Sequence, residues 1–281
     1  MSLSARAKEE DGRLKRYVQA LTLTVLGKRH AGRSLTVFPH DVFLVSYPRS
    51  GNTWARFLVG NLLNRSDPVT FANVERRVPT IYAWPDRALR SLPRILKSHE
   101  CFDPRYPRVI YILRDPRDVS VSLYYYLLKM RDLSDGYPMD DFVARFIKAD
   151  VVPYVDRMGC WEDHVLSWLR LRKGNPGFLL IRYEDLVDNP ANELAKLAPL
   201  LGVDPTPEII ERAVSACSAG NMRSLETKQS KDWLLTKKSR QDIRFVREAK
   251  SGGWRDELSE ASVQAIEHAW GATMRELGYI T

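Results

Sequence analysis

The sequence predicts an α/β fold in which a doubly wound, mainly parallel sheet is flanked by helices within a single domain. Four short and nearly continuous apolar runs occur, and such runs are typical of strands that are buried on both faces of a parallel sheet. Longer segments with helical spacing separate them. This alternation indicates βαβ units, which build a doubly wound sheet.

The expected strands occupy residues 41–46, 94–98, 108–113 and 178–183. Helices are expected between and after them, at residues 53–63, 116–130, 139–149, 161–171, 192–201, 208–216 and 259–277. The helix after the third strand has a clear start, because Asp115 can cap it and Pro116 can take its first position. Irregular lobes are expected within residues 67–93 and 131–159.

A charged segment precedes the first strand. Its acidic and basic residues lie ahead of a short apolar run, which predicts an amphipathic surface helix. We therefore expect a helical extension over residues 1–34 and one α/β domain over residues 35–281.

Composition restricts the partners and the location of the protein. The chain has 43 Lys and Arg against 35 Asp and Glu, a net charge of +8, which favours an anionic partner such as phosphate, sulfate or nucleic acid. Its hydrophobic content of 44% excludes disordered and collagen-like classes. Cys101, Cys160 and Cys217 fit neither a zinc pair nor a disulfide framework, and no apolar stretch is long enough for a membrane span. We expect a soluble, cytoplasmic protein without a metal site.

The first strand leads into a tight loop that can bind an anion. This loop contains Arg49, Ser50, Gly51, Asn52, Thr53 and Trp54, and a helix follows. A strand, loop and helix N-terminus in this order direct backbone N–H groups toward one anion, as in a P-loop. Compared with the nucleotide pattern GxxxxGK[ST], Gly51 and Thr53 fit, but Asn52 replaces the lysine that reaches the β and γ phosphates. The loop therefore suits a donor with a single 5′-phosphate, and a turn without a ligand is the alternative.

The segment YPRSGNTW resembles the 5′-phosphosulfate loop of sulfotransferases that use 3′-phosphoadenosine 5′-phosphosulfate (PAPS). That family usually has lysine where this chain has Arg49. Arginine keeps the positive charge and adds a bidentate fork for phosphate or sulfate oxygens. The resemblance implies a P-loop-like fold and PAPS as the donor substrate.

A second segment, RDPRDVSVS, follows the third strand and is similar to the family's 3′-phosphate motif. The resemblance implies that Arg114 and Ser122 bind that phosphate. Arg114 lies at the end of a strand, where open α/β sheets bind ligands. For Arg117 and Asp118 we expect only a local, exposed ion-pair cluster of small energy.

The segment FVREAKSGGW (residues 245–254) is similar to the family's C-terminal cofactor loop, FxRKGxxGDW. Arg247 matches, whereas Glu248 replaces the usual lysine, and Lys250 is expected to supply the missing charge. Trp54 and Tyr183 correspond to the family's aromatic residues around adenine. Ordinary core aromatics are the alternative for these two.

His99 is the expected general base among five histidines. It follows the second strand in Lys97-Ser98-His99, which resembles the family's Lys-Thr-His, whose histidine takes the acceptor proton. The resemblance implies in-line sulfuryl transfer without a metal to a hydroxyl, or to an amine. Lys97 and Arg49 would stabilise the sulfuryl and bridging oxygens, and Ser122 would hold the donor.

Two other function classes remain open. A P-loop kinase would require ATP and Mg²⁺, and a polyanion-binding module would bind without turnover. No nucleic-acid-binding motif supports the second class. The acceptor is expected to be a small molecule with a hydroxyl; its expected contacts are consistent with an aromatic or apolar alcohol but do not require one, and its identity is open. Its expected contacts are Tyr82, Trp84, Phe102, Tyr125, Tyr137, His164 and Trp233, with Glu100 orienting His99 or engaging a polar acceptor. The family's dimer segment is not reproduced in residues 255–264, and the oligomeric state is open.

Overall fold

The computed structural model describes residues 30–64, 66–151, 158–233 and 235–281. Its sheet has four parallel strands in the order β2-β1-β3-β4. Their bounds are β1 (Val42–Ser46), β2 (Ile95–Ser98), β3 (Arg108–Leu113) and β4 (Phe178–Arg182). The predicted strands are therefore confirmed within one residue at each end. Most of the helix expected in residues 1–34 lies outside the described residues.

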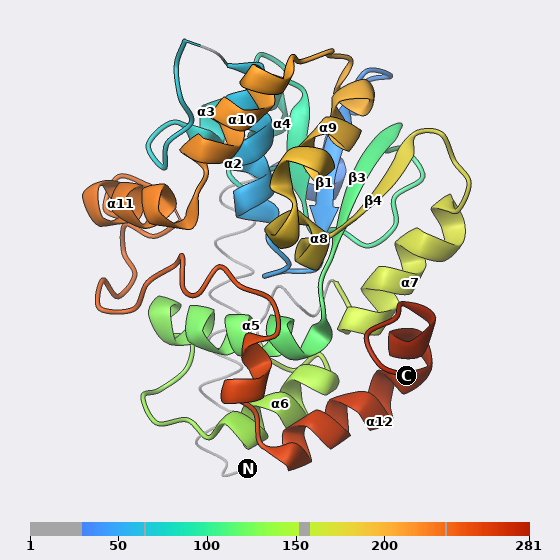
Figure 1. The fold of residues 1–281 in the computed structure, drawn as a ribbon, viewed down its shortest axis with the longest axis vertical. Coiled ribbons are helices and arrows are strands. Elements are labelled where there is room, and N and C mark those ends of the chain that lie inside the picture. The colour runs from blue at the N-terminus through green and yellow to red at the C-terminus, as the bar shows by residue number, and fades with distance from the viewer. Residues whose placement is uncertain (1–29, 65, 152–157, 234) are drawn as a thin grey trace.

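Helices cover both faces of this sheet (Figure 1). One group consists of α2 (Asn52–Leu63), α8 (Tyr183–Asp188), α9 (Pro190–Leu201), α10 (Pro207–Ala216) and α11 (Ala219–Gln229). The other group consists of α5 (Pro116–Met130), α6 (Met139–Ile147), α7 (Trp161–Arg172) and α12 (Glu260–Glu276). Short helices α3 (Val74–Arg77) and α4 (Asp86–Leu89) lie within the lobe expected to be irregular, and η1 (Gly32–Ser34) and η3 (Gly253–Asp256) are single 3₁₀ turns.

The strands divide the core because successive side chains point to opposite faces. In β1, Val42 and Leu44 pack in the cluster that contains α2, α9 and α10. Phe43 and Val45 pack in the cluster that contains α5, α6, α7 and α12. Both clusters are buried, which explains why the strands read as continuous apolar runs. The doubly wound fold is thereby confirmed.

Local sequence signals explain where the helices begin. Asp115 accepts a hydrogen bond from the backbone N–H of Arg117 at 2.9 Å, so that α5 begins as predicted. Asn189 caps α9 in the same way, through the N–H of Asn192 at 3.2 Å. None of the helices in the described ranges is long and apolar enough to cross a membrane.

The parallel arrangement brings the carboxyl ends of all four strands to one edge of the sheet. The residues after these ends include the loop before α2, His99 after β2, Arg114 after β3 and Tyr183 after β4. Segments that are far apart in the sequence therefore meet there.

Candidate active site

The loop between β1 and α2 has a backbone conformation that requires glycine at one position. Gly51 has a φ of 96°, and a Cβ there would lie 2.4 Å from Cδ2 of the Tyr183 ring. Arg49 also has a positive φ, 70°, which is a strained conformation for a residue with a side chain. The loop thus turns tightly and brings its amides to the N-terminus of α2, where an anion is favoured.

Arg49 reaches across the site to α5. Its Nε donates a hydrogen bond to Oγ of Ser122 at 3.2 Å, and its Nη2 donates to the carbonyl of Phe245 at 3.4 Å. The guanidinium also lies over the rings of Tyr126 and Phe245, 4.8 and 4.5 Å from their centroids. The structure therefore brings together Arg49 and Ser122, two residues that the sequence predicted for one site.

Asn52 faces the sheet with its side chain. Its Nδ2 donates to the carbonyl of Leu44 and to Oγ of Ser46, at 3.1 and 3.2 Å. The side chain of Asn52 therefore stabilises the end of β1, and only its backbone is available to an anion in the loop. The neighbouring Ser50 Oγ is buried and has no hydrogen-bond partner among the described residues, whereas Thr53 lines the cavity described below.

The backbone fixes one tautomer of His99. Its Nδ1 lies 2.7 Å from the carbonyl oxygen of Ser46, and because a carbonyl can only accept, Nδ1 carries the proton and Nε2 has a free lone pair. The backbone N–H of His99 donates to the Tyr82 hydroxyl at 2.9 Å. Burial and the charge of Lys97 hold the pKa of His99 well below its usual value. The imidazole is therefore neutral near pH 7.

Lys97 lies two residues earlier and lines the same cavity. Burial, together with the charges of Arg56 and Arg49, lowers the pKa of Lys97 to about 7, although Glu75 opposes this shift. Its ammonium group thus sits in surroundings that favour the approach of an anion.

Arg114 and two aromatic residues form another wall. The Arg114 guanidinium lies 4.0 Å from the centroid of the Tyr183 ring, and its Nη1 donates to the carbonyl of Arg49 at 3.1 Å. Trp54 packs edge-on against Tyr183 with ring centroids 6.0 Å apart, and its Nε1 donates to the Cys217 carbonyl at 2.9 Å. All three side chains line the cavity.

The C-terminal loop brings two more cations to the cavity. Arg247 pairs with Glu257 at 2.7 Å and lies 3.6 Å from the centroid of the Tyr125 ring. Lys250 pairs with Asp256 at 3.1 Å. Arg247 and Lys250 both line the cavity.

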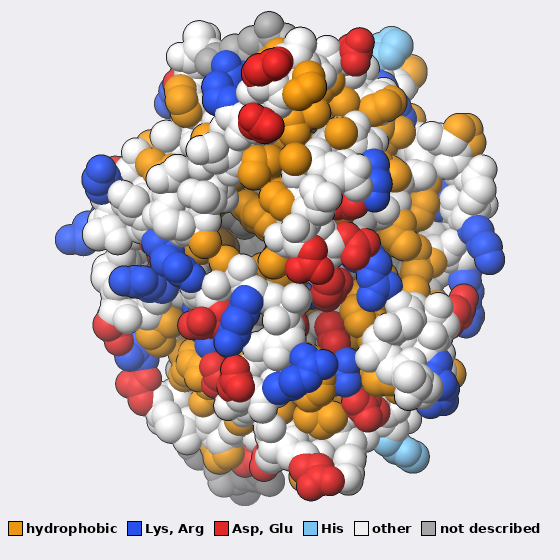
Figure 2. All heavy atoms as spheres, viewed as in Figure 1, with side chains coloured by type: hydrophobic (Ala, Val, Ile, Leu, Met, Phe, Trp, Pro, Cys, Tyr) orange, Lys and Arg blue, Asp and Glu red, His pale blue; other side chains and the backbone are white. Residues whose placement is uncertain are grey.

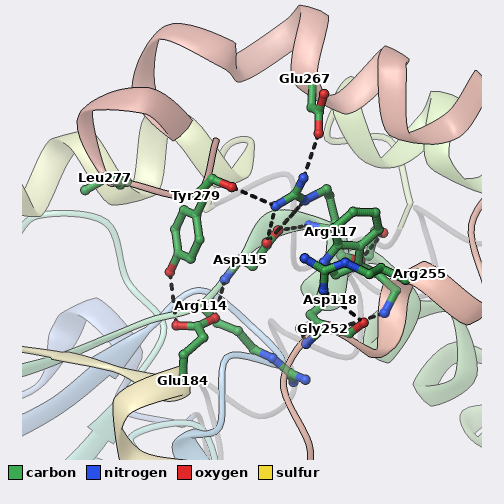
Figure 3. A network of polar contacts seen from close by, with 12 residues as sticks. Arg114, Asp115, Arg117, Asp118, Glu184, Gly252, Arg255, Glu267, Leu277 and Tyr279 are labelled. Atoms are coloured by element: carbon green, nitrogen blue, oxygen red, sulfur yellow. Dashed lines mark hydrogen bonds and ion pairs between the residues drawn. The ribbon is translucent and has the colours of Figure 1, made fainter. Parts of the chain in front are cut away.

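Arg117 and Asp118 are buried, so the prediction of an exposed local cluster is wrong (Figure 3). Arg117 pairs with Asp115 and with Glu267 of α12, each at 2.6 Å. Asp118 accepts hydrogen bonds from the backbone N–H groups of Gly252 and Trp254, at 2.7 and 3.0 Å. The short-range pattern of the sequence did not reveal these contacts with distant segments.

A cavity of about 1120 Å³ lies between these groups. The residues that line it differ from the acceptor contacts that the sequence predicted. Of those contacts only Tyr82 and Glu100 line it, because the others pack elsewhere. His164 and Trp233 are buried in the core, and Trp84, Phe102, Tyr125 and Tyr137 pack against it or against other side chains.

Tyr126 and Met130 line the cavity but were not predicted. Their spacing of four and eight residues from Ser122 places them on one face of α5, which is a signal that could have identified them.

The comparisons with known proteins agree with this geometry. A family model described as a sulfotransferase domain matches residues 39–278. Human sulfotransferase 2B1 is 30% identical over 253 residues, which cover 84% of this chain and 66% of that protein. Rat sulfotransferase 1E1 is 26% identical over 258 residues, covering 85% of this chain and 84% of the other. The chain belongs to the sulfotransferase family.

Solved structures confirm the fold of this sulfotransferase. Mouse sulfotransferase SULT7A1, in complex with PAP, superposes with a TM-score of 0.69 at 23% identity and covers 87% of each chain. Retinol dehydratase, in complex with androsterone and PAP, gives a TM-score of 0.71 at 20% identity and covers 87% of this chain and 83% of its own. The family match confirms the predicted enzyme class, a sulfotransferase.

Proposed function

We propose that this sulfotransferase moves the sulfuryl group of PAPS to the hydroxyl of a small molecule, with His99 as the general base. The contact between His99 Nδ1 and the Ser46 carbonyl carries the proposal, because it leaves Nε2 unprotonated and able to accept a proton. The lowered pKa of His99 keeps the base in its active form near neutral pH.

The donor would bind along the carboxyl edge of the sheet. The loop Arg49, Ser50, Gly51, Asn52, Thr53 and Trp54 would hold the 5′-phosphosulfate, with Asn52 contributing through its backbone. Arg114 and Ser122 would bind the 3′-phosphate together with Arg247 and Lys250. Trp54 and Tyr183 would enclose adenine, since their rings form one wall of the cavity. These roles are supported by the meeting of all four segments at one cavity.

In the reaction, the acceptor oxygen attacks sulfur while its proton passes to Nε2 of His99. The new S–O bond forms opposite the bond that links sulfur to the 5′-phosphate, and that bond breaks with its electron pair on the phosphate oxygen. The products are the sulfated acceptor and adenosine 3′,5′-bisphosphate (PAP). Lys97 and Arg49 would stabilise the charge that grows on the sulfuryl and bridging oxygens.

We infer that the acceptor is a largely apolar alcohol with a polar group near the transferred position. Apolar and aromatic side chains of Tyr126, Met130, Met158 and Phe245 line the cavity, which favours an apolar body. Retinol dehydratase, which shares this fold, was solved in two complexes with such compounds, one with androsterone and one with retinol. Glu100 lines the cavity next to the base, so that a polar acceptor group could contact it.

A residue substitution tests the base. His99→Ala should keep the affinity for PAP and lose about 10²–10⁴-fold in the rate of sulfate transfer from labelled PAPS to a panel of phenols and alcohols. His40→Ala, which changes an exposed histidine, is the matched control and should keep the rate. Turnover of His99→Ala close to that of the unchanged protein would remove His99 from the mechanism.

Nucleotide binding separates the other function classes. A kinase would bind ATP with Mg²⁺ more tightly than PAP, whereas we expect PAP to bind more tightly with chelator present. A polyanion-binding module would bind heparin or nucleic acid in a salt-dependent way and transfer no sulfate. Figure 2 favours the enzyme over such a module, because basic and acidic side chains are intermixed on the face that it shows.

We also propose a cytoplasmic location and a division of the chain into an extension (residues 1–34) and the α/β domain (residues 35–281). The free thiols of Cys101, Cys160 and Cys217 support the location. Limited proteolysis tests the division, since cleavage should be confined to the region before residue 35. A fragment that begins there should retain PAP binding.

A further inference from the structure

Asp118 is one of several acids in the wall of the cavity, and it lies beside the cations that the proposed function assigns to an anionic nucleotide. It is only 4% exposed. A carboxylate so placed would repel phosphate and would be costly to bury unless other groups compensated it. Both of its oxygens are occupied: Oδ2 accepts from the N–H of Gly252 at 2.7 Å, and Oδ1 accepts from the N–H of Trp254 at 3.0 Å.

Two further contacts hold the same loop against the start of α5. The Arg117 guanidinium lies 4.0 Å from the centroid of the Trp254 ring. Arg114 Nη2 donates to the backbone carbonyl of Lys250 at 3.3 Å. The segment from Lys250 to Trp254 is therefore held by three charged residues around the N-terminus of α5, namely Arg114, Arg117 and Asp118. Of the three, only Asp118 makes two hydrogen bonds to this segment.

This loop also presents cations to the cavity. Arg247 and Lys250 line it, and Gly252 takes a left-handed φ of 74° that directs the chain back toward α5. A shift of the backbone at Gly252 would move Lys250, two residues away. The position of Lys250 therefore depends on the carboxylate of Asp118, whereas the backbone of Arg247 is also held by the guanidinium of Arg223.

We propose that Asp118 is a positioning residue that holds residues 247–254 over the 3′-phosphate of the nucleotide, so that discrimination between PAP and 5′-AMP depends on it. The inference rests on the proposed function, which assigns Arg247 and Lys250 to the 3′-phosphate. Asp118 acts through the loop backbone, and the nucleotide contacts are made by the loop cations and Arg114.

Removal of the charge distinguishes positioning from simple electrostatics. Asp118→Asn has the same shape, but its oxygen can accept only one of the two loop N–H groups, while its amide faces the other. A purely Coulombic effect would make PAP bind more tightly, because a negative charge is lost from the cavity. Positioning predicts the opposite: the dissociation constant for PAP rises by about tenfold or more, and the dissociation constant for 5′-AMP stays within about twofold.

The experiment is calorimetric titration of PAP and 5′-AMP into the full chain, Asp118→Asn and the control Glu248→Gln. Glu248 is exposed at the same cavity and in the same loop, so its substitution removes an equal charge without removing a hydrogen bond to the loop backbone. Glu248→Gln should leave PAP binding unchanged or tighter. Unchanged or tighter PAP binding by Asp118→Asn, or an equal loss for both nucleotides, would overturn the inference.

Two measurements on the unchanged protein complete the test. Equal affinity for PAP and 5′-AMP would overturn the proposed 3′-phosphate site itself, which is a different result from a failure of Asp118 alone. Residue-resolved amide exchange does not depend on the folding of a variant. The amides of Gly252 and Trp254 should exchange about tenfold more slowly than that of Ser251, and equal exchange at the three positions would contradict the proposed contacts.

Discussion

Substitution of Gly51 by alanine should destabilise the protein by about 2–5 kcal/mol. The first contribution is the backbone, because a φ of 96° costs a residue with a side chain about 1–2 kcal/mol. The second is overpacking of about 1–3 kcal/mol, since the new Cβ would lie 2.4 and 2.8 Å from Cδ2 and Cε2 of Tyr183. Tyr183 has little freedom to move away, because it is buried beneath the guanidinium of Arg114.

Equilibrium denaturation measures this effect, and a double substitution separates its two parts. In a Tyr183→Ala background every side-chain atom that the new Cβ would meet is absent, so Gly51→Ala should cost only the backbone part. The coupling energy between the two positions should then be about 1–3 kcal/mol. Gly220→Ala is the matched control, since no atom lies within 4 Å of its Cβ in helix α11, and it should be neutral or slightly stabilising. A cost below about 1 kcal/mol for Gly51→Ala, or additive effects in the double variant, would refute this reasoning.

Three further predictions concern the reaction. Arg49→Ala should lower kcat more than it raises KM for PAPS, because the proposed role of the Arg49 guanidinium is to stabilise charge that develops only in the transition state. Steady-state kinetics in which only KM changed would contradict this role. Arg114→Ala should weaken PAP binding by about 1.5–3 kcal/mol and 5′-AMP binding much less, as measured by calorimetry. With the pKa of Lys97 at about 7, its ammonium loses the proton as the pH rises, so kcat/KM for PAPS should fall above about pH 7. Lys97→Arg should remove this fall because arginine stays protonated, and an unchanged pH profile in that variant would exclude Lys97 as its cause. The acid limb of the profile should lie below pH 6.5, since the pKa of His99 is lowered.

The parts of the fold that could be predicted are those with local signals. Strand β3 and helix α5 match their predicted bounds, because a continuous apolar run is followed directly by the Asp115-Pro116 helix start. Helix α11 was not predicted, since its sequence AGNMRSLETKQ contains few apolar residues and buries only Met222 and Glu226. Tyr183 was expected to end a strand but begins α8. The residues around Tyr183 fit the spacing of a strand and also that of a helix, so the sequence alone could not place the boundary between β4 and α8.

Predicted site residues such as Arg49, His99, Arg114 and Tyr183 meet at one cavity because parallel strands place their carboxyl ends together, which topology ensures before any contact is known. No rule of topology applied to the residues expected to contact the acceptor, and they were predicted from residue type alone. His164 shows why that was insufficient: its ring lies in the core, with Nδ1 2.8 Å from the Tyr111 hydroxyl and Nε2 3.1 Å from the His99 carbonyl. Its contact with the backbone carbonyl of His99 gives it a structural position behind the cavity.

Net charge is a poor guide to this anion site, although it suggested an anionic partner. The cations of the C-terminal loop have acidic partners, with Arg247 on Glu257 and Lys250 on Asp256, and Figure 2 shows both signs of charge mixed on the surface. A paired cation exerts a weaker long-range attraction, but its side chain is held in place before a ligand arrives. Groups fixed in this way require little reorganisation when they stabilise a charge. We therefore expect selectivity for the nucleotide to depend on where the cations are held, so that their acidic partners Glu257 and Asp256 and the buried Asp118 matter as much as the cations do.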